Sequence, residues 1–529
     1  MHAAPKEVQV CDAAQHACKP ARFAPYNDAM AIYRESSEAI GNLYDGERVH
    51  RDAYLSTEIF ALEMERLFAR RWLYAGHMSQ VPQAGDFITL EIAGTTLLMI
   101  RQADGGVQIM ANRCAHKGAM LRCQASGHVD RAIQCPYHAW SYRLDGSLLA
   151  VPLREGYQGS HLATSEAAGG LTRFQTTVYR DFVFVCLDPN AAGLTAQVPA
   201  ELLGCLDAMA DRSPLGRLEV AGPCLRNVIE CNWKIYLENI NDTVHANVTH
   251  ESSALSAEAV WQRTQSAAPS ALKKPMAIEQ LLPFSSGSDF MEKMGGRVWA
   301  GGHSILGIHA SLHSDYSSVP GYEQAMIAAW GETRAKQILA WSPQNALIYP
   351  SIAFKSAPQT LRVIRPLGVS RTLVEIWAFR ALGAPDVLLE RTQTYNRIVF
   401  SPMSIVAHDD VQVFESIQRG LAGAGNEWVS LHRGHAGTRA ADGSRSESES
   451  VATVGGTDER LMRNQYRAWL EALVPSDTAS HESVSGESAS AASASAASAS
   501  GESASTKGIP AKRDSGDAPR VSSAGVTKS

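Results

Sequence analysis

The sequence predicts an α+β protein in which a β-rich region precedes a second domain that combines an antiparallel sheet with helices. Short runs of apolar and β-branched residues, separated by turn residues, occur between residues 86 and 187 and again between 346 and 382. From about residue 190 such runs alternate irregularly with segments that have the apolar spacing of a helix. This order of elements is typical of a meander followed by an α+β domain.

Length and charge limit the classes to which the chain can belong. Its 529 residues suffice for two or three domains, and 45% hydrophobic with 19% charged residues is ordinary for a globular protein. A formal net charge of −6 argues against a nucleic-acid partner. No apolar run is long enough to span a membrane, and the N-terminus does not look like a secretory signal. Nine cysteines, an odd number, favour reduced thiols and a cytoplasmic location.

The first half of the chain is expected to contain a helix and then several strands. Residues 57–70 have helical apolar spacing, and Ser56 can cap the start of that helix. The strand-like runs DFITLEI, TTLLMIR and GVQIMAN follow and predict a β meander, and TTVYRDFVFVCL (176–187) predicts further strand.

The second half is expected to contain three antiparallel strands and two helices. The strands are predicted within ALIYPSIAFKS (346–356), TLRVIRPLG (360–368) and TLVEIWAFRAL (372–382). A helix is expected over residues 411–421 and a loop over residues 436–456.

The last helix is predicted from TDERLMRNQYRAWLEALVP. We expect Thr457 to cap it, Pro475 to stop it, and one face to be apolar: Met462, Tyr466, Trp469 and Leu473. The Ser/Ala-rich tail beyond it has little to bury and is expected to be disordered. No G-x-G-x-x-G follows a predicted strand, so no NAD or flavin fold is expected.

Two pairs of cysteine and histidine lie within the predicted meander. Cys114 and His116 occur in NRCAHKG, and Cys135 and His138 occur in QCPYHAWSYRLDGSL. These four side chains could bind one zinc ion tetrahedrally, or a [2Fe–2S] cluster with the cysteines on one iron and the histidines on the other. Ligand types alone do not separate these two possibilities, and a third is that no metal is bound.

The residues around the two pairs resemble the Rieske iron–sulfur signature. The pattern C-x-H, an 18-residue gap and C-x2-H is present, with flanks similar to the C-P-Y-H-x-W-x-Y-x-x-D-G run of Rieske oxygenases. The resemblance implies that Cys114 and Cys135 hold one iron and that His116 and His138 hold the exposed one. Respiratory Rieske proteins have an extra disulfide between these loops, for which no cysteines stand in place here. The resemblance therefore favours the low-potential oxygenase type.

A second constellation, D-x2-H-x4-H, lies in ECNWKIYLENINDTVHANVTH. Its members are Asp242, His245 and His250. Positions five apart on a regular helix differ by about 140°. The two histidines can therefore meet at one ion only if the helix is bent or locally widened. The alternative is an amphipathic helix with two incidental histidines.

This stretch resembles the α subunits of Rieske aromatic-ring-hydroxylating oxygenases. The matching residues are Asn232, Trp233, Lys234, Glu238 and Asn239, in addition to the D-x2-H-x4-H pattern. The resemblance covers roughly residues 50–430, and its wording is closest to the salicylate, anthranilate and benzoate branch.

The resemblance also implies roles for the remaining site residues. His245, His250 and a downstream carboxylate would hold a mononuclear Fe(II). The second aspartate of the pair at 409–410 is the expected ligand, so Asp410 would bind iron, while Asp409 with Gln412 would form a capping box. Asp242 would bridge His138 of one subunit to His245 of the next and carry electrons between them, which implies a ring of subunits.

The expected domains are an N-terminal segment (1–50), a Rieske [2Fe–2S] domain (51–175), a catalytic domain of the helix-grip type (176–475) and a disordered tail (476–529). The expected function is that of a terminal oxygenase which uses O2 at Fe(II) to hydroxylate an aromatic compound. Its partners would be a ferredoxin or reductase that passes on electrons from NAD(P)H, a small β subunit, and further copies in a trimeric ring (α3 or α3β3).

An aromatic carboxylate is the expected substrate, and it would need a basic group in the pocket. Arg362, Arg365 and Arg371 lie in the predicted strand region, but the sequence assigns this role to none of them. Three alternatives stay open: a Rieske monooxygenase or demethylase for another substrate, a Rieske electron carrier, and a zinc-stabilised binding protein.

Overall fold

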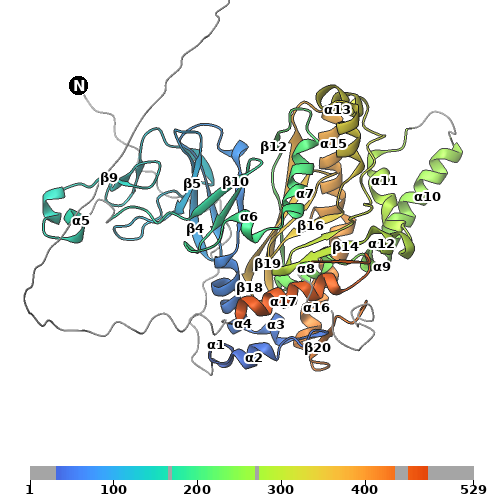
Figure 1. The fold of residues 1–529 in the computed structure, drawn as a ribbon, viewed down its shortest axis with the longest axis horizontal. Coiled ribbons are helices and arrows are strands. Elements are labelled where there is room, and N and C mark those ends of the chain that lie inside the picture. The colour runs from blue at the N-terminus through green and yellow to red at the C-terminus, as the bar shows by residue number, and fades with distance from the viewer. Residues whose placement is uncertain (1–30, 165–168, 268–272, 435–450, 475–529) are drawn as a thin grey trace, which may run out of the picture. The chain divides into compact units, whose positions relative to one another are not determined.

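The computed structural model describes residues 31–164, 169–267, 273–434 and 451–474 (Figure 1). The predicted Ser/Ala-rich tail, and Pro475 before it, lie outside the described residues. Within these ranges no helix combines the length and the apolar character that crossing a membrane requires.

The first described residues form short helices and one strand. The predicted helix over 57–70 is present, and the Ser56 hydroxyl accepts a hydrogen bond from the Ile59 N–H, as expected of its cap. Its second half is not a regular α-helix, because a π-helical turn and a 3-10 turn follow α4. The elements are α1 (Ile32–Glu35), α2 (Ser37–Gly41), β1 (Arg48–His50), α3 (Asp52–Leu55), α4 (Thr57–Leu62), a π-helix (Glu63–Leu67) and a 3-10 helix (Phe68–Arg70).

The β-rich region consists of three small antiparallel sheets. The predicted meander is confirmed as β3 (Asp86–Ile92), β4 (Thr95–Arg101) and β5 (Val107–Ala111), with β6 (Ser126–His128) beside β3. A second sheet contains β7 (Ile133–Gln134), β8 (Ser141–Tyr142) and β9 (Leu148–Ala150). A third contains β10 (Gln175–Tyr179), β11 (Phe182–Cys186) and β2 (Leu73–His77). The predicted strand over 176–187 is thus a hairpin.

A nine-stranded antiparallel sheet forms the second half of the fold, in the order β12-β19-β18-β17-β16-β15-β14-β21, with β13 also paired to β19. Two predictions for this sheet need correction. The run 346–356 is two strands, because the chain turns at Tyr349–Ser351. The predicted loop over 436–456 ends in a strand, β21, whose β-branched VATV run pairs with β14. The strands are β12 (Leu218–Val220), β13 (Leu225–Ile229), β14 (Gly296–Trp299), β15 (Ser304–Leu306), β16 (Asn345–Ile348), β17 (Ile352–Lys355), β18 (Thr360–Gly368), β19 (Arg371–Ala381) and β21 (Val451–Val454).

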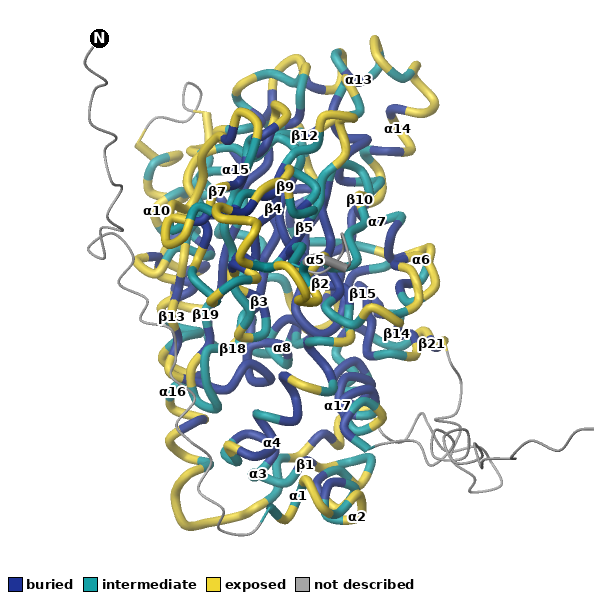
Figure 2. The backbone as a smooth tube through the Cα atoms, turned by 90° about the vertical axis from the view of Figure 1, so that its left-hand side faces the viewer, coloured by how far each residue is buried: buried dark blue, intermediate teal, exposed yellow. Residues whose placement is uncertain are grey.

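Alternate residues of this sheet serve different cores, because successive side chains of a strand point to opposite faces. Ile348, Phe354 and Val363 belong to the core that includes α7 (Ala200–Asp211). Their neighbours on the other face, such as Leu347 and Ala353, belong to the core that includes α8 (Trp233–Ile240) and α16 (Ile405–Ala422). Figure 2 shows the buried residues following the strands and the inner helices. The second face therefore lies under α16, which carries Asp410, and under α8, which leads to the segment with His245 and His250.

The remaining α-helices and a second π-helix complete the catalytic half of the fold, except that α5 belongs to the β-rich region after β9. In chain order they are α5 (His161–Thr164), α6 (Leu194–Gln197), α9 (Val244–Thr249), α10 (Glu251–Ala267), α11 (Met276–Leu281), α12 (Ser288–Met294), α13 (Tyr322–Trp330), α14 (Glu332–Ala340), α15 (Asp386–Tyr395), a π-helix (Asn396–Phe400) and α17 (Arg460–Leu473). A short strand, β20 (Trp428–Ser430), pairs with β1.

Both predicted helix caps near the C-terminus are wrong. Helix α16 begins at Ile405, where the Ser404 hydroxyl accepts the Ala407 N–H at 3.1 Å, so Asp409 lies inside the helix and cannot form a capping box. Helix α17 begins at Arg460, and the Thr457 hydroxyl instead donates to Glu292 at 2.5 Å. The predicted apolar face of α17 is correct, since all four of its residues are buried.

A buried carboxylate connects the first helices to α8 and α17. Glu63 is 0% exposed and accepts hydrogen bonds from Lys234 Nζ at 2.5 Å and from Trp469 Nε1 at 2.7 Å. The indole of Trp233 donates to the other carboxylate oxygen at 2.8 Å. Burial lowers the pKa of Lys234, while the charge of Glu63 opposes that shift.

We expect Glu63→Ala to lower the free energy of unfolding by roughly 3–5 kcal/mol, because it leaves the buried ammonium of Lys234 without its counter-charge. The double variant Glu63→Leu/Lys234→Met, which removes both charges, should lose less than Glu63→Ala alone. Chemical denaturation followed by circular dichroism measures both. Equal losses in the two variants would show that packing, and not the buried charge, sets the cost.

Candidate active site

The two Cys/His loops have the same backbone form. In the first, Cys114 N–H donates to Ala119 and Gly118 N–H donates to Cys114. In the second, Cys135 N–H donates to Trp140 and Ala139 N–H donates to Cys135. The fifth residue of each loop has positive φ, +77° at Gly118 and +58° at Ala139. The first loop follows β5 and the second joins β7 to β8, so two similar tight loops are presented by neighbouring sheets.

The side chains of these loops sort into a thiol pair and an imidazole pair. Cys114 and Cys135 are buried and close enough to interact. The rings of His116 and His138 lie 4.7 Å apart between centroids, and His116 stacks on Trp140. His138 is exposed, whereas the Nδ1 atom of His116 is buried without a hydrogen-bond partner among the described residues. An unpartnered imidazole nitrogen of this kind fits a metal ligand.

Hydrogen bonds also reach both sulfur atoms. The Tyr142 hydroxyl lies 3.0 Å from Cys114 Sγ, and the backbone N–H groups of Tyr137 and His138 bond to Cys135. Burial raises the pKa of the Cys135 thiol, the two backbone bonds oppose this, and the neighbouring Cys114 sulfur adds to it. A bound metal would instead favour the thiolate.

Ligand separations favour a two-metal cluster over a single zinc ion. Tetrahedral zinc brings its ligand atoms within roughly 3.3–3.8 Å of one another. Across the described ranges, His245, His250 and Asp410 form the one group of three or more His, Cys, Asp or Glu whose ligand atoms all lie within 4.8 Å. No three of the four loop ligands meet that limit. Thiols on one side and imidazoles on the other fit a cluster with two irons.

The helix that carries the two iron-site histidines is broken rather than widened. Helix α8 ends at Ile240, α9 spans Val244–Thr249, and His250 lies at the junction with α10 with φ −104° and ψ 6°. The Asp242 carboxylate accepts the Val244 N–H at 2.9 Å and so helps to start α9. The predicted bend is therefore present, but it comes from breaks in the helix and not from a π-bulge at this position.

The break brings His245 and His250 to Asp410 of α16. His250 Nε2 lies 3.2 Å and His245 Nε2 lies 3.8 Å from Asp410 Oδ1. Among the described residues the buried Nδ1 atoms of both histidines have no hydrogen-bond partner, and Asn239 donates to Asp410 at 3.2 Å. Two imidazoles and one carboxylate that converge in this way fit the facial set of ligands of non-haem Fe(II) enzymes.

Two nearby residues escaped the sequence analysis in this role. Asp409 Oδ2 lies 3.6 Å from His250 Nδ1, where it can orient the imidazole. Arg433, which precedes the gap in the described residues, lies beside Asp242 although it is 191 positions away in the chain. No local pattern marks such a distant partner.

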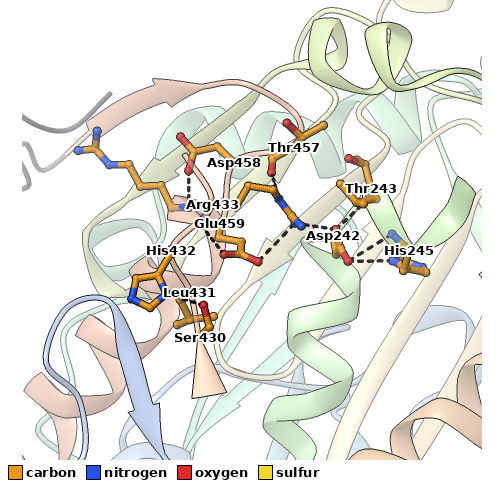
Figure 3. A network of polar contacts seen from close by, with 12 residues as sticks. Asp242, Thr243, His245, Ser430, Leu431, His432, Arg433, Thr457, Asp458 and Glu459 are labelled. Carbon is orange, nitrogen blue, oxygen red and sulfur yellow. Dashed lines mark hydrogen bonds and ion pairs between the residues drawn. The ribbon is translucent and has the colours of Figure 1, made fainter. Parts of the chain in front are cut away.

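Asp242 lies between a cation and the first histidine (Figure 3). Its Oδ1 atom accepts from Arg433 Nη2 at 3.1 Å, and its Oδ2 atom is 3.5 Å from His245 Nδ1. Burial raises the pKa of Asp242, but His245, the Val244 N–H and Arg433 more than offset it and leave the pKa below its usual value. Asp242 makes no contact with His138 within the described chain, so the predicted bridge between these two residues does not occur inside one subunit.

Two groups of candidate ligands, one on a small β domain and one on a helix–sheet domain, are the arrangement expected of a Rieske non-haem iron oxygenase. Residues 71–164 match the Rieske [2Fe-2S] domain, and residues 209–474 match the ring hydroxylating alpha subunit (catalytic domain). The chain belongs to the ring-hydroxylating oxygenase α subunits. Its cofactors are those of the family, a Rieske cluster and a mononuclear iron with O2 as co-substrate, and members of the family receive electrons from a separate ferredoxin or reductase. The predicted family, fold class and cofactors are thereby confirmed.

Several known dioxygenases are similar in sequence. The anthranilate 1,2-dioxygenase large subunit of Acinetobacter baylyi is 30% identical over 398 residues, which is 73% of this chain and 80% of that protein. The toluate 1,2-dioxygenase subunit alpha of Pseudomonas putida is 27% identical over 445 residues, 81% of this chain and 91% of that protein. The biphenyl 2,3-dioxygenase subunit alpha of Rhodococcus jostii is 28% identical over 378 residues, 70% and 77% of the two chains.

Solved structures share the fold. Naphthalene 1,2-dioxygenase with bound indole gives a TM-score of 0.65 at 21% identity and covers 83% of this chain and 94% of its own. A quaternary ammonium Rieske monooxygenase gives a TM-score of 0.56 at 18% identity, covering 83% and 98% of the two chains.

The Tyr142 hydroxyl predicts a measurable effect on the cluster. Tyr142→Phe removes the hydrogen bond to Cys114 Sγ, which leaves more negative charge on the sulfur and should lower the reduction potential. Potentiometric titration of the Rieske visible spectrum measures it. Tyr157→Phe, which alters a ring that packs on Trp140 without touching a sulfur, is the control. An unchanged potential in Tyr142→Phe would mean that Cys114 is not a cluster ligand.

Proposed function

We propose that the chain is the terminal oxygenase that hydroxylates an aromatic carboxylate. Each turnover would consume O2, two electrons and two protons. The product would be either a cis-dihydrodiol of the ring or a phenol together with one molecule of water. The observation that carries the oxygenase activity is the convergence of His245, His250 and Asp410 within 4.8 Å. The carboxylate is supported by relatives named for anthranilate and toluate, although others are named for the neutral arenes biphenyl and benzene.

We assign the cofactor ligands as follows. Cys114 and Cys135 hold one iron of the Rieske cluster, and His116 and His138 hold the other. His245, His250 and Asp410 hold the mononuclear iron, which when bound supplies the centre for O2 activation. The exposure of His138 supports its role as the point at which electrons leave the cluster.

The division of the chain and its assembly belong to the same proposal. The Rieske domain would span residues 51–175 and the catalytic domain residues 176–475. Asp242 would join His138 of one subunit to His245 of the next in a trimeric ring, with or without a small β subunit. Asp242 already contacts His245 and makes no contact with His138 within the described chain, which is consistent with a neighbouring subunit as its second partner. A ferredoxin or reductase would supply the electrons from NAD(P)H.

The ligand assignment predicts that Asp410→Ala loses the mononuclear iron and the hydroxylation, because only two ligands are left. The Rieske visible spectrum should be unchanged, since its ligands lie on other elements. Iron analysis together with the spectrum measures both. His408→Ala, an exposed neighbour on α16, is the matched control and should keep its iron. Loss of both signals in Asp410→Ala, or of neither, contradicts the assignment.

A monooxygenase or demethylase for another substrate is the second candidate. The likeness in fold to a quaternary ammonium monooxygenase shows that this architecture also accommodates such an enzyme. Oxygen uptake with a surrogate reductase, followed by identification of the product, separates the two. A cis-dihydrodiol or ring phenol formed from an aromatic acid supports the first candidate, whereas formaldehyde release from a methylated substrate supports the second.

Asp242 and Arg433 predict a kinetic effect. Asp242→Asn should slow reoxidation of the reduced Rieske cluster in a single turnover, since it removes the charge that holds His245. Arg433→Gln should slow it less, by about 2- to 5-fold, because the guanidinium is partly exposed. Stopped-flow absorbance measures the rates. Glu459→Gln, which changes another partner of Arg433 and does not touch Asp242, is the control. Equal rates in all variants would remove Asp242 from the electron path.

A further inference from the structure

Two cationic side chains are buried on the sheet face that lies under the iron-site helices. Lys355 ends β17 and is 6% exposed, and Arg362 lies in β18 and is 4% exposed. In the register of the two strands Ala353 pairs with Arg362 and Lys355 pairs with Thr360. Lys355 and Arg362 are therefore diagonal neighbours on one face, the face of Leu347 and Ala353 that packs toward α8.

Neither cation has a carboxylate partner among the described residues. The ammonium of Lys355 donates one hydrogen bond, to the Tyr395 hydroxyl at 2.8 Å. Arg362 donates to Asn345 at 2.6 Å and also bonds Tyr236, while its Nε atom is buried without a partner. Lys234, which is similarly buried, has Glu63 as its counter-charge. Buried cations are normally paired in this way, since an uncompensated charge in the interior is costly.

The two cations share one aromatic neighbour. Lys355 Nζ lies 5.8 Å and Arg362 Cζ lies 4.8 Å from the centroid of the Phe400 ring. Burial and the charge of Arg362 lower the pKa of Lys355 well below its usual value. The charge of Asp410 opposes this shift, but no carboxylate of the described residues lies within ion-pair distance of either cation, and an anion between them would relieve their repulsion.

The pair belongs to the surroundings of the iron ligands. Lys355 interacts electrostatically with both Asp410 and His245. A line of ring contacts joins the two places: Tyr395 lies 4.8 Å from His313, His313 lies 5.6 Å from Phe284, and Phe284 lies 5.5 Å from His250. Apolar rings with a few charged groups are typical of a site for a small aromatic ligand.

We propose that Lys355 and Arg362 bind the carboxylate group of the aromatic substrate. This rests on the proposed function, which it deepens by naming the residues that select an acid. A carboxylate can accept from the free N–H groups of Lys355 and from Nε of Arg362, and it supplies the charge that both lack. Asp410 does not fill this role, because its carboxylate is directed to the two histidines.

Arg365 of β18 and Arg371 of β19, the other two arginines named in the sequence analysis, are excluded as anchors. Arg365 pairs with Glu375 at 2.7 Å, and Arg371 pairs with Glu230 at 3.3 Å with more than half of its side chain exposed. Arg362 alone among the three arginines considered from the sequence faces the iron-site helices. Lys355 was not predicted from the sequence, although a lysine directly after the apolar residues of a short buried strand is a signal for such a site.

The test compares acids with their neutral amides. Dissociation constants of benzoate and benzamide, and of salicylate and salicylamide, are measured by calorimetry on iron-loaded protein and again on protein whose mononuclear iron has been removed. Wild type should bind each acid more tightly than its amide. Lys355→Met and Arg362→Met should each raise the dissociation constant of the acid by about 10- to 100-fold, which is the range for one charged hydrogen bond. The dissociation constant of the amide should change by less than about 2-fold. Arg371→Gln, which removes an exposed cation from the neighbouring strand β19, should change the binding of neither compound.

Three outcomes would overturn the proposal. The first is that the wild type binds acids no more tightly than amides, and the second is that the variants weaken the binding of acid and amide equally. The third is that the variants lose the mononuclear iron and still prefer acids, which would mean that Lys355 positions Asp410. Retention of the Rieske spectrum shows that a variant has folded. If Lys355→Met loses this spectrum, the acid and amide dissociation constants of Lys355→Gln and Arg362→Met decide the test instead. The proposed function fails differently, when no aromatic compound, acid or neutral, is hydroxylated by wild type.

Discussion

The buried carboxylate of Glu63 holds the frame on which the iron site depends. It joins three segments that are far apart in the chain: the π-helical turn that contains it, the start of α8 at Trp233 and Lys234, and α17 at Trp469. Helix α8 leads directly into the break that sets His245 and His250 at different angles. Because Lys234 and both indoles find their hydrogen-bond partner in one side chain, the position of α8 is fixed from within the core.

Side chains of the nine-stranded sheet alternate between two faces, one of which packs in a core while the other carries Lys355 and Arg362 near the predicted iron ligands. The core on the α7 side holds Ile348, Phe354 and Val363, and the charges on that face, Arg365 and Glu375, pair with each other at 2.7 Å. Residues that point to α8 and α16 include Lys355 and Arg362 among apolar neighbours. Strands buried on both faces tolerate such charges only where a ligand or partner meets them, because water does not reach them. One sheet thus provides a solid core on one side and the floor of a site on the other.

Local patterns allowed the metal ligands to be predicted, whereas distant contacts did not follow from them. The Cys/His loops, the meander and the apolar face of α17 depend on spacings of a few residues. The cap assigned to Asp409 was wrong because helix α16 begins earlier, where Ser404 accepts the Ala407 N–H. The cap assigned to Thr457 was wrong because its hydroxyl donates to Glu292, which only the fold brings near. Arg433 beside Asp242, and Glu63 beside Lys234, are likewise pairs that no short stretch of sequence contains.

The contrast between Lys234 and Lys355 separates a structural charge from a functional one. Both are almost fully buried lysines. The first has a carboxylate at 2.5 Å, so its charge is compensated in the folded chain itself. The second has a phenol as its single hydrogen-bond partner in the described structure, and Arg362, its nearest charged neighbour on the sheet, repels it. Iron bound at His245, His250 and Asp410 would add further positive charge to the same region. Two buried cations that lack an ion-pair partner in the described structure would be stabilised by a bound anion, which is the physical reason for the acidic ligand proposed above.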